Sequence, residues 1–266
     1  MAKAFAGNHS TPPKQQDALR GLLTYLKTEQ SAVDLHLSLE RFAADLEKGL
    51  YFDSNIPVGY GLGSSGALTA AVFDRFYEGA EVVDLPLLKE KMAQIEAHFH
   101  GASSGIDPLI CYLRTAIMME STSQLRRVNI PDWTQEAGQL FLLNTQLPRQ
   151  TGPLVNIFRE RCQEEYYRLH CETELAPLTN DAIHAFLQKN WDLLFPCVHE
   201  ISHFQFRYFD AMIPKAFRSI WLDGLGADLY KLKLCGAGGG GFILGFTNDW
   251  IETQRALKDY QLLKIR

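Results

Sequence analysis

The sequence lacks the features that mark membrane-spanning, secreted and broadly nucleic-acid-binding proteins. No apolar run reaches the roughly 18–20 residues that a transmembrane helix needs. Residues 1–10 contain no hydrophobic segment of the kind found in signal peptides. The formal net charge is −5, which argues against a broad nucleic-acid-binding surface. These absences favour a cytoplasmic protein that binds neither membranes nor nucleic acid.

Cysteine is scarce and irregularly spaced. The five cysteines are an odd number and form no CxxC pair, so the sequence predicts neither a disulfide framework nor a zinc knuckle. Hydrophobic residues make up 46% of the chain and charged residues 21%, which is ordinary for a globular protein. A chain of 266 residues suits one large or two small domains.

Helix-like and strand-like segments are mixed without an internal repeat, which predicts an α+β fold with two layers per domain. Helices are expected at 14–28, 37–48, 67–77, 86–99, 152–169, 181–191 and 199–209, and near the end of the chain. Strands are expected at 50–56, 116–119, 125–130, 139–144, 231–235 and 242–246, with a last one after the final helix. Residues 1–13 are expected to be a loose start. The predicted domains are 1–135 and 136–266.

A glycine-rich loop at residues 56–66 runs directly into a predicted helix. Backbone N–H groups at a helix N-terminus bind phosphate, so the loop indicates an anionic ligand, with a nucleotide as the first hypothesis. The loop also fits the GxGxxG pattern of dinucleotide-binding proteins through Gly61, Gly63 and Gly66, with Asp84 about twenty residues on. Against that alternative, the next ninety residues or so show no βαβ alternation.

Two carboxylates flank a second loop of small residues. Glu96 lies on a predicted helix, and Asp107 follows the Gly/Ser-rich segment 100–105. One carboxylate can hold Mg²⁺, which prefers hard oxygen ligands together with phosphate oxygens. The other can orient or deprotonate an attacking hydroxyl. Either residue alone is more simply interpreted as a solvated or turn-capping acid, but both together beside a phosphate loop favour a metal–nucleotide site.

A third glycine-rich segment, residues 236–241, separates two predicted strands. A hairpin turn needs only one or two residues with positive φ, so five glycines in six positions indicate close approach of the backbone to a ligand or to another loop. Elsewhere, His199, Glu200 and His203 spell the HExxH zinc motif. No characteristic third ligand follows them, and we interpret the match as chance.

The order and spacing of these motifs resemble those of the GHMP kinases. Residues 57–66 resemble the phosphate-binding motif of that family and residues 236–240 its C-terminal motif, while 100–107 and 143–151 are most similar to the mevalonate kinase branch. The resemblance covers roughly residues 50–245. It implies a ribosomal-S5-domain-2-like N-terminal domain, a ferredoxin-like C-terminal domain, and an ATP- and Mg²⁺-dependent enzyme acting on a small-molecule alcohol.

The resemblance also assigns roles by position. Asp107 would face the substrate hydroxyl, and Ser65 and Glu96 would hold Mg²⁺. The expected nucleotide-binding residues are Gly59, Gly61, Leu62, Gly63, Ser64, Ser65, Gly66, Ser104 and Thr145. Gly238 and Gly239 would bind substrate.

One element of the family is not found. Its members begin with a lysine-bearing strand and a Gly-Glu-His-like turn, and residues 1–13 are expected to contain neither, which points to a fragment, a mis-started chain or a lineage without that segment. Three alternatives therefore stay open beside mevalonate phosphorylation: another GHMP-type kinase, a nucleotide-binding chain with poor catalysis, and a Rossmann-type NAD enzyme. A homodimer is compatible with the sequence.

Overall fold

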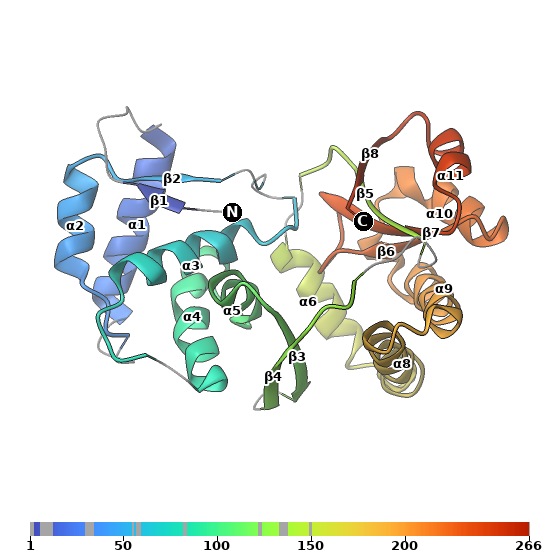
Figure 1. The fold of residues 1–266 in the computed structure, drawn as a ribbon, viewed down its shortest axis with the longest axis horizontal. Helices are drawn as coiled ribbons and strands as arrows, with labels where there is room; N and C mark the ends of the chain where they lie inside the picture. The colour runs from blue at the N-terminus through green and yellow to red at the C-terminus, as the bar shows by residue number, and fades with distance from the viewer. Residues whose placement is uncertain are drawn as a thin grey trace. The chain divides into compact units, whose positions relative to one another are not determined.

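The structure, a computed structural model, describes residues 3–5, 13–29, 35–54, 56, 60–81, 84–121, 124–132, 138–148 and 151–265. The chain divides into two compact units. The first comprises Met1–Val58 and Gly63–Asn129, and the second comprises Gly59–Leu62 and Ile130–Arg266. Both units mix helices and strands (Figure 1), so the α+β prediction is confirmed. The assignment of functions to domains 1–135 and 136–266 stays a prediction.

The first unit is mainly helical. Its helices are α1 (Pro13–Glu29), α2 (Leu39–Glu47), α3 (Ser64–Phe76), α4 (Leu85–His100) and α5 (Ile106–Leu113). Two small antiparallel sheets accompany them: β1 (Lys3–Phe5) with β2 (Tyr51–Asp53), and β3 (Ala116–Ser121) with β4 (Gln124–Val128).

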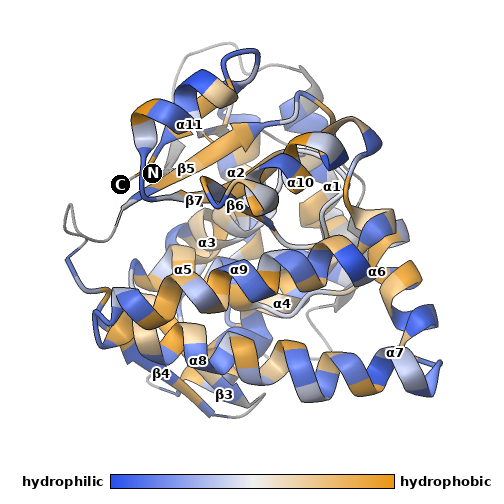
Figure 2. Ribbon diagram, turned by 90° about the vertical axis from the view of Figure 1, so that its right-hand side faces the viewer, coloured by the Kyte–Doolittle hydropathy of each residue, from blue (hydrophilic) through white to orange (hydrophobic). Residues whose placement is uncertain are grey.

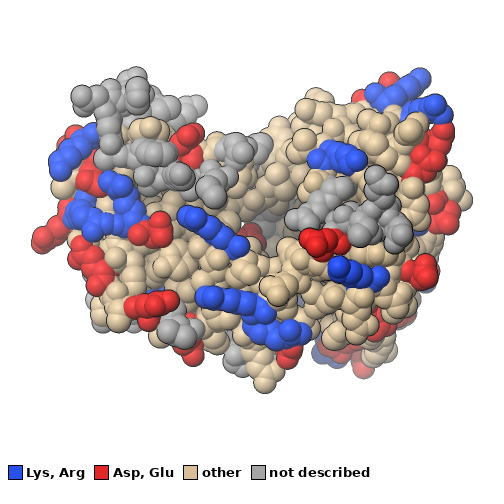
Figure 3. Space-filling view, in the orientation of Figure 1, with Lys and Arg blue, Asp and Glu red and all other residues tan. Residues whose placement is uncertain are grey.

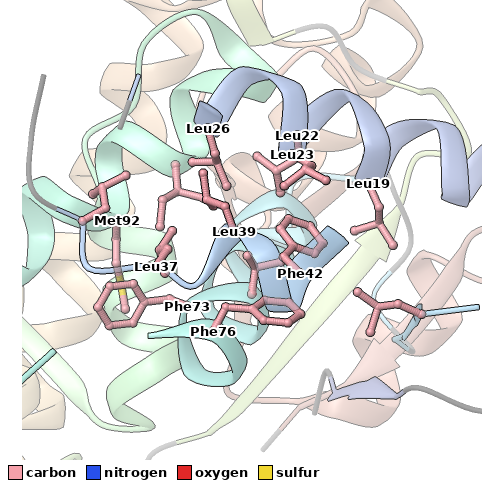
Figure 4. Packing of buried hydrophobic residues seen from close by; sticks show 14 of the residues in the cluster. Leu19, Leu22, Leu23, Leu26, Leu37, Leu39, Phe42, Phe73, Phe76 and Met92 are labelled. Carbon is pink, nitrogen blue, oxygen red and sulfur yellow. The ribbon is translucent and has the colours of Figure 1, made fainter. Parts of the chain in front are cut away.

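The core of the first unit forms where α1 meets α2 and α3. The apolar side chains of α1 recur at the spacing of one helix face and are buried: Leu19, Leu22, Leu23 and Leu26. Figure 4 shows them beside the rings of Phe42 and Phe76, which stack with centroids 4.6 Å apart. This packing fixes α3, the helix that follows the phosphate loop.

The second unit is built on a four-stranded antiparallel sheet with the order β6-β7-β5-β8. Its strands are β5 (Gln139–Asn144), β6 (Tyr230–Leu234), β7 (Phe242–Thr247) and β8 (Gln261–Lys264). Its helices are α6 (Thr151–Arg161), α7 (Glu165–His170), α8 (Ala176–Leu187), α9 (Trp191–Tyr208), α10 (Arg218–Gly226) and α11 (Trp250–Ala256), with a π-helical turn at Cys171–Leu175. β5 is largely orange in Figure 2 because its centre is an unbroken apolar run.

Helices α9 and α10 pack against β6. The buried Trp221 of α10 donates its indole N–H to the Ser202 hydroxyl of α9 at 2.9 Å. Gln205 of α9 accepts the backbone N–H of Leu234 at 2.9 Å, at the point where β6 ends. These contacts fix the start of the glycine-rich segment 236–241.

Several expected elements differ from the structure. Residues 1–13 are not simply a loose start, because Lys3–Phe5 forms β1 and pairs with β2. The helix expected at 67–77 begins at Ser64, and the strand expected at 50–56 is confined to Tyr51–Asp53. Helices α5 and α10 were not predicted.

The helices of the second unit also have different limits. The single helix expected at 152–169 is interrupted after Arg161 and resumes at Glu165. The helix expected at 181–191 is instead Ala176–Leu187. Trp191 begins α9 rather than ending a helix, because Asn190 caps α9 by accepting the Leu193 N–H at 3.2 Å.

Surface charge is mixed on the face drawn in Figure 3. Among the described residues coloured there, lysines and arginines are interspersed with aspartates and glutamates. None of the described helices has the length and apolar character needed to cross a membrane.

Candidate functional site

The phosphate loop ends in a helix whose N-cap is glycine. Gly61 and Gly63 have φ of +78° and +72°, a left-handed conformation that glycine adopts without strain. Ser64, Ser65 and Gly66 then form the first turn of α3. The first N–H groups of a helix have no partner within the helix and carry the positive end of its dipole. The glycine conformations and the helix start that the loop was expected to have are therefore present from Gly61 to Gly66. Phosphate binding by this loop stays a prediction, and Gly59 lies outside the described residues.

Gly66 lets the first turns of α3 and α5 touch. A Cβ at position 66 would lie 2.8 Å from Cβ of Asp107 and 2.9 Å from the nitrogen of Pro108, too close for any side chain. A Cβ at position 63 would lie 3.5 Å from Oδ2 of Asp107. The Asp107 carboxylate therefore lies against the phosphate loop, as the motif spacing predicted.

Gly105 sets the position of α5. It is the N-cap of α5 with φ +74°, and a Cβ there would lie 2.2 Å from the carbonyl oxygen of Lys89 in α4. Only glycine allows this approach of the α5 start to the α4 backbone. The location of Asp107, two residues further on, depends on it.

Glu96 is buried and held by two serines. Its side chain is 5% exposed, although it is a carboxylate on a helix. Ser65 donates its hydroxyl to Oε1 of Glu96 at 2.9 Å, and Ser103 donates to Oε2. The structure thus brings together Ser65 and Glu96, the two predicted metal ligands.

The donor set of Glu96 and Ser65 fits a magnesium ion. Within the described ranges Glu96 makes no ion pair, and buried charges in proteins are otherwise paired or coordinate metals. Mg²⁺ takes hard oxygen ligands, commonly one or two carboxylates with substrate phosphates supplying others. In the described part of the chain, no three His, Cys, Asp or Glu side chains gather as a metal centre. In magnesium sites of this kind, a bound phosphate and water commonly supply the further ligands.

Ser103 was missed by the sequence reasoning, which selected Ser104 instead. Ser104 is exposed, and among the described residues its hydroxyl accepts the Ile106 N–H at 3.4 Å. Ser103 lies beyond the end of α4, in the turn that follows Gly101, so helix periodicity gave no signal for its contact with Glu96. The nucleotide contact of Ser104 stays a prediction.

The charge around this site affects Cys111 of α5, one turn after Asp107. Burial raises the pKa of the Cys111 thiol, and the negative charges of Asp107 and Glu96 raise it further. We predict that Asp107→Asn lowers the pKa of Cys111, because one repelling charge is lost. Since the thiolate is the nucleophile, alkylation by iodoacetamide at about pH 8 should become faster.

Peptide-resolved mass spectrometry after timed alkylation measures this rate. Asp74→Asn, an exposed substitution on α3, is the control and should leave the rate at Cys111 unchanged. Equal rates at Cys111 in Asp107→Asn and the wild-type protein would contradict the placement of Asp107.

The glycine-rich segment of the second unit is enclosed by other parts of that unit. A Cβ would lie 2.5 Å from the Met212 carbonyl oxygen at Gly238, and 2.3 Å from a Leu154 methyl at Gly239. At Gly241 it would lie 2.2 Å from the Tyr60 carbonyl oxygen. The inference that these glycines permit close approach to another loop is therefore confirmed.

Thr145 supports the same segment. It is 5% exposed, and its hydroxyl donates to the carbonyl oxygen of Gly241 at 2.7 Å while accepting the Leu147 N–H at 3.3 Å. The described contacts of Thr145 are therefore structural, and its predicted nucleotide contact stays a prediction. Gly239 lines a cleft of about 780 Å³ that also includes Lys215 and Arg218.

The HExxH residues lie on α9 in a different setting. His199 Nδ1 is 3.9 Å from Oδ1 of Asp228, and the same oxygen accepts from Lys231 Nζ at 2.5 Å. The hydrogen bond and charge of Lys231, with a smaller effect of His199, hold the pKa of Asp228 below its usual range. His199 and Glu200 line a pocket of the second unit whose walls contain both polar and apolar side chains.

The dinucleotide alternative conflicts with the fold. Every pairing between described strands is antiparallel, whereas a dinucleotide fold needs parallel βαβ units. Asp84 does not serve a ribose site, because its carboxylate caps α4 by accepting the Leu87 N–H at 2.7 Å. The GxGxxG match therefore does not mark a dinucleotide-binding fold in the described part of the chain.

Comparison with known proteins agrees with this geometry. The family model for the GHMP kinases N terminal domain matches residues 25–115. Mevalonate kinase of Candida albicans is 24% identical over 78% of this chain and 54% of its own length. The chain thus spans about half the length of that relative.

Two solved structures share the fold. L. major mevalonate kinase, solved in complex with R-mevalonate, matches with a TM-score of 0.64 and 14% identity over 99% of this chain and 85% of its own. The Lin0012 protein from Listeria innocua matches with a TM-score of 0.62 and 17% identity over 98% and 81%. The family model, the sequence relative and the fold neighbours agree in one likeness: residues 25–115 match the N-terminal domain of the GHMP kinases, and the chain is similar to mevalonate kinase.

Proposed function

We propose that this protein is an ATP- and Mg²⁺-dependent kinase that phosphorylates a small-molecule alcohol, with mevalonate as the acceptor and 5-phosphomevalonate as the product. The observation that carries the proposal is the position of Asp107, whose carboxylate lies against Gly63 and Gly66 of the phosphate loop. The hydrogen bond from Ser65 to Glu96 supports it, because Ser65 lies in the same first turn of α3 as Gly66.

Different residues would have different roles in phosphoryl transfer, which depends mainly on positioning and charge stabilisation. The first turn of α3 would hold the phosphates through its N–H groups. Charge neutralisation at the phosphates would come from a magnesium ion held by Ser65 and Glu96. The Asp107 carboxylate would orient the acceptor hydroxyl and take its proton as that oxygen attacks the terminal phosphorus of ATP. The bond from that phosphorus to the bridging oxygen would break, and ADP would leave.

The cleft beside Gly239 belongs to the second unit and is lined by Lys215 and Arg218 together with Asp210. Cations of this kind recognise a carboxylate, and mevalonate carries both a carboxylate and a primary hydroxyl. The family resemblance implies that Gly238 and Gly239 bind substrate.

A substrate panel tests the acceptor. ADP release is measured with mevalonate, homoserine, galactose and phosphomevalonate, each with and without a chelator that removes Mg²⁺. We expect mevalonate to give the highest kcat/KM and chelation to abolish ADP release. A different preferred alcohol would indicate another GHMP-type kinase, and ATP binding without ADP release would indicate a nucleotide-binding chain without catalysis.

The five cysteines, none of them in a disulfide, accord with a cytoplasmic location, which we include in the proposal. A homodimer stays a prediction, and size-exclusion chromatography with light scattering tests it.

A further inference from the structure

Ser103 occupies the turn between α4 and α5, and its hydroxyl makes two directed hydrogen bonds. It accepts the backbone N–H of Gly105 at 2.9 Å and donates its single proton to Oε2 of Glu96. A serine hydroxyl has one proton to donate. Because Ser103 donates it to Glu96, its oxygen is the acceptor in the bond with Gly105. Ser103 therefore connects a side chain of α4 to the N-cap residue of α5.

The two oxygens of Glu96 consequently have different surroundings. Oε1 accepts from Ser65 in the first turn of α3, while Oε2 accepts from Ser103 on the other side. The terminal torsion of a glutamate is broad, so a carboxylate held at one oxygen only keeps rotational freedom. With both oxygens held, a buried carboxylate has a single orientation.

We propose that Ser103 is a positioning residue, whose hydroxyl holds Oε2 so that Glu96 presents Oε1 alone, together with Ser65, to a divalent cation. The inference rests on the proposed function, because it assigns the cation to the nucleotide-binding site. Through the Gly105 N–H, the same hydroxyl fixes the distance between the cation ligand Glu96 and the start of α5, where Asp107 lies.

Binding of Mn²⁺ in the presence of a non-hydrolysable ATP analogue tests this role without turnover. Free Mn²⁺ is measured by electron paramagnetic resonance in titrations of the purified full chain. Ser103→Ala should weaken Mn²⁺ binding by about tenfold, the lower end of the effect seen when an outer-shell partner of a metal ligand is removed. Ser103→Thr keeps the hydroxyl and should recover most of the affinity.

Thr24→Ala is the control, since it removes an exposed hydroxyl of α1 that donates to the Arg20 carbonyl oxygen. It should bind Mn²⁺ as the wild-type protein does. Thermal unfolding checks that each variant is folded. If Ser103→Ala does not fold, Ser103→Cys replaces it, because the thiol keeps the volume and donates only a weak hydrogen bond.

The outcomes distinguish the positioning role of Ser103 from the proposed function. Equal Mn²⁺ affinity in the wild-type protein and the folded Ser103 variant would overturn the positioning role while leaving the proposed function intact. Absence of Mn²⁺ and nucleotide binding in the wild-type protein would overturn the proposed function and this inference with it. An equal loss in Thr24→Ala would also overturn the inference, because the effect would then not be specific to the Ser103 hydroxyl.

Discussion

Asp107→Asn is expected to lower kcat by about 10²- to 10⁴-fold, the usual range for loss of a general base. An amide can neither accept the hydroxyl proton nor supply the negative charge that orients it. In the described part of the chain, the Asp107 carboxylate is exposed and takes part in no hydrogen bond or ion pair. The substitution should therefore leave stability and ATP binding near wild type.

An ADP-release assay with mevalonate measures the loss, and isothermal titration with a non-hydrolysable ATP analogue measures nucleotide affinity. Asp74→Asn is the control, since it removes the same charge from an exposed position of α3. Turnover near wild type in Asp107→Asn would show that another group takes the proton.

Gly105→Ala is expected to be the most destabilising of the glycine substitutions in the first unit. The new Cβ would lie 2.2 Å from the Lys89 carbonyl oxygen, which is backbone and cannot rotate away. The residue must also keep φ +74°, which costs an L-residue about 1–2 kcal/mol. Steric overpacking adds about 1–3 kcal/mol, so we expect a total loss of about 2–5 kcal/mol in the free energy of unfolding.

Gly101→Ala measures how much unfolding free energy is lost through the left-handed conformation without a steric clash. Gly101 also has φ +74°, but a Cβ there meets nothing within 4 Å. We expect a loss of about 1–2 kcal/mol for this variant, from the left-handed conformation alone. Urea denaturation measures the loss in the free energy of unfolding for both variants. If the two variants lose the same stability, the close contact between α5 and α4 does not exist in the protein.

The family resemblance indicated which side chains meet better than the sequence pattern indicated the elements that carry them. Ser65 and Glu96 come together as the resemblance implied, although no local pattern relates two residues that are 31 positions apart. Helix α5 was missed because it has only eight residues, Ile106–Leu113, and follows a glycine- and serine-rich loop, so it offers little periodicity to detect. Helix α10 was missed because Gly224 and Gly226 lower its helix propensity, while packing of Trp221 stabilises it.

Local partners could not be predicted at the level of single side chains. Ser103 and Ser104 are adjacent and chemically identical, and only the left-handed turn through Gly101 and Gly105 decides which hydroxyl faces Glu96. The hydrogen bond between Thr145 and Gly241 is likewise a tertiary contact across 96 residues of chain. Neither the periodicity nor the composition of the sequence predicts such a contact.

Gly63 leaves α3 without a capping side chain. Serine, threonine, aspartate or asparagine at an N-cap typically stabilises a helix by about 1 kcal/mol, but its oxygen would bind the same N–H groups that a phosphate needs. Helix α3 therefore lacks this stabilisation, and under the proposed function a bound phosphate would take the place of the capping side chain. We then expect amide hydrogen exchange in the first turn of α3 to slow when the nucleotide is added.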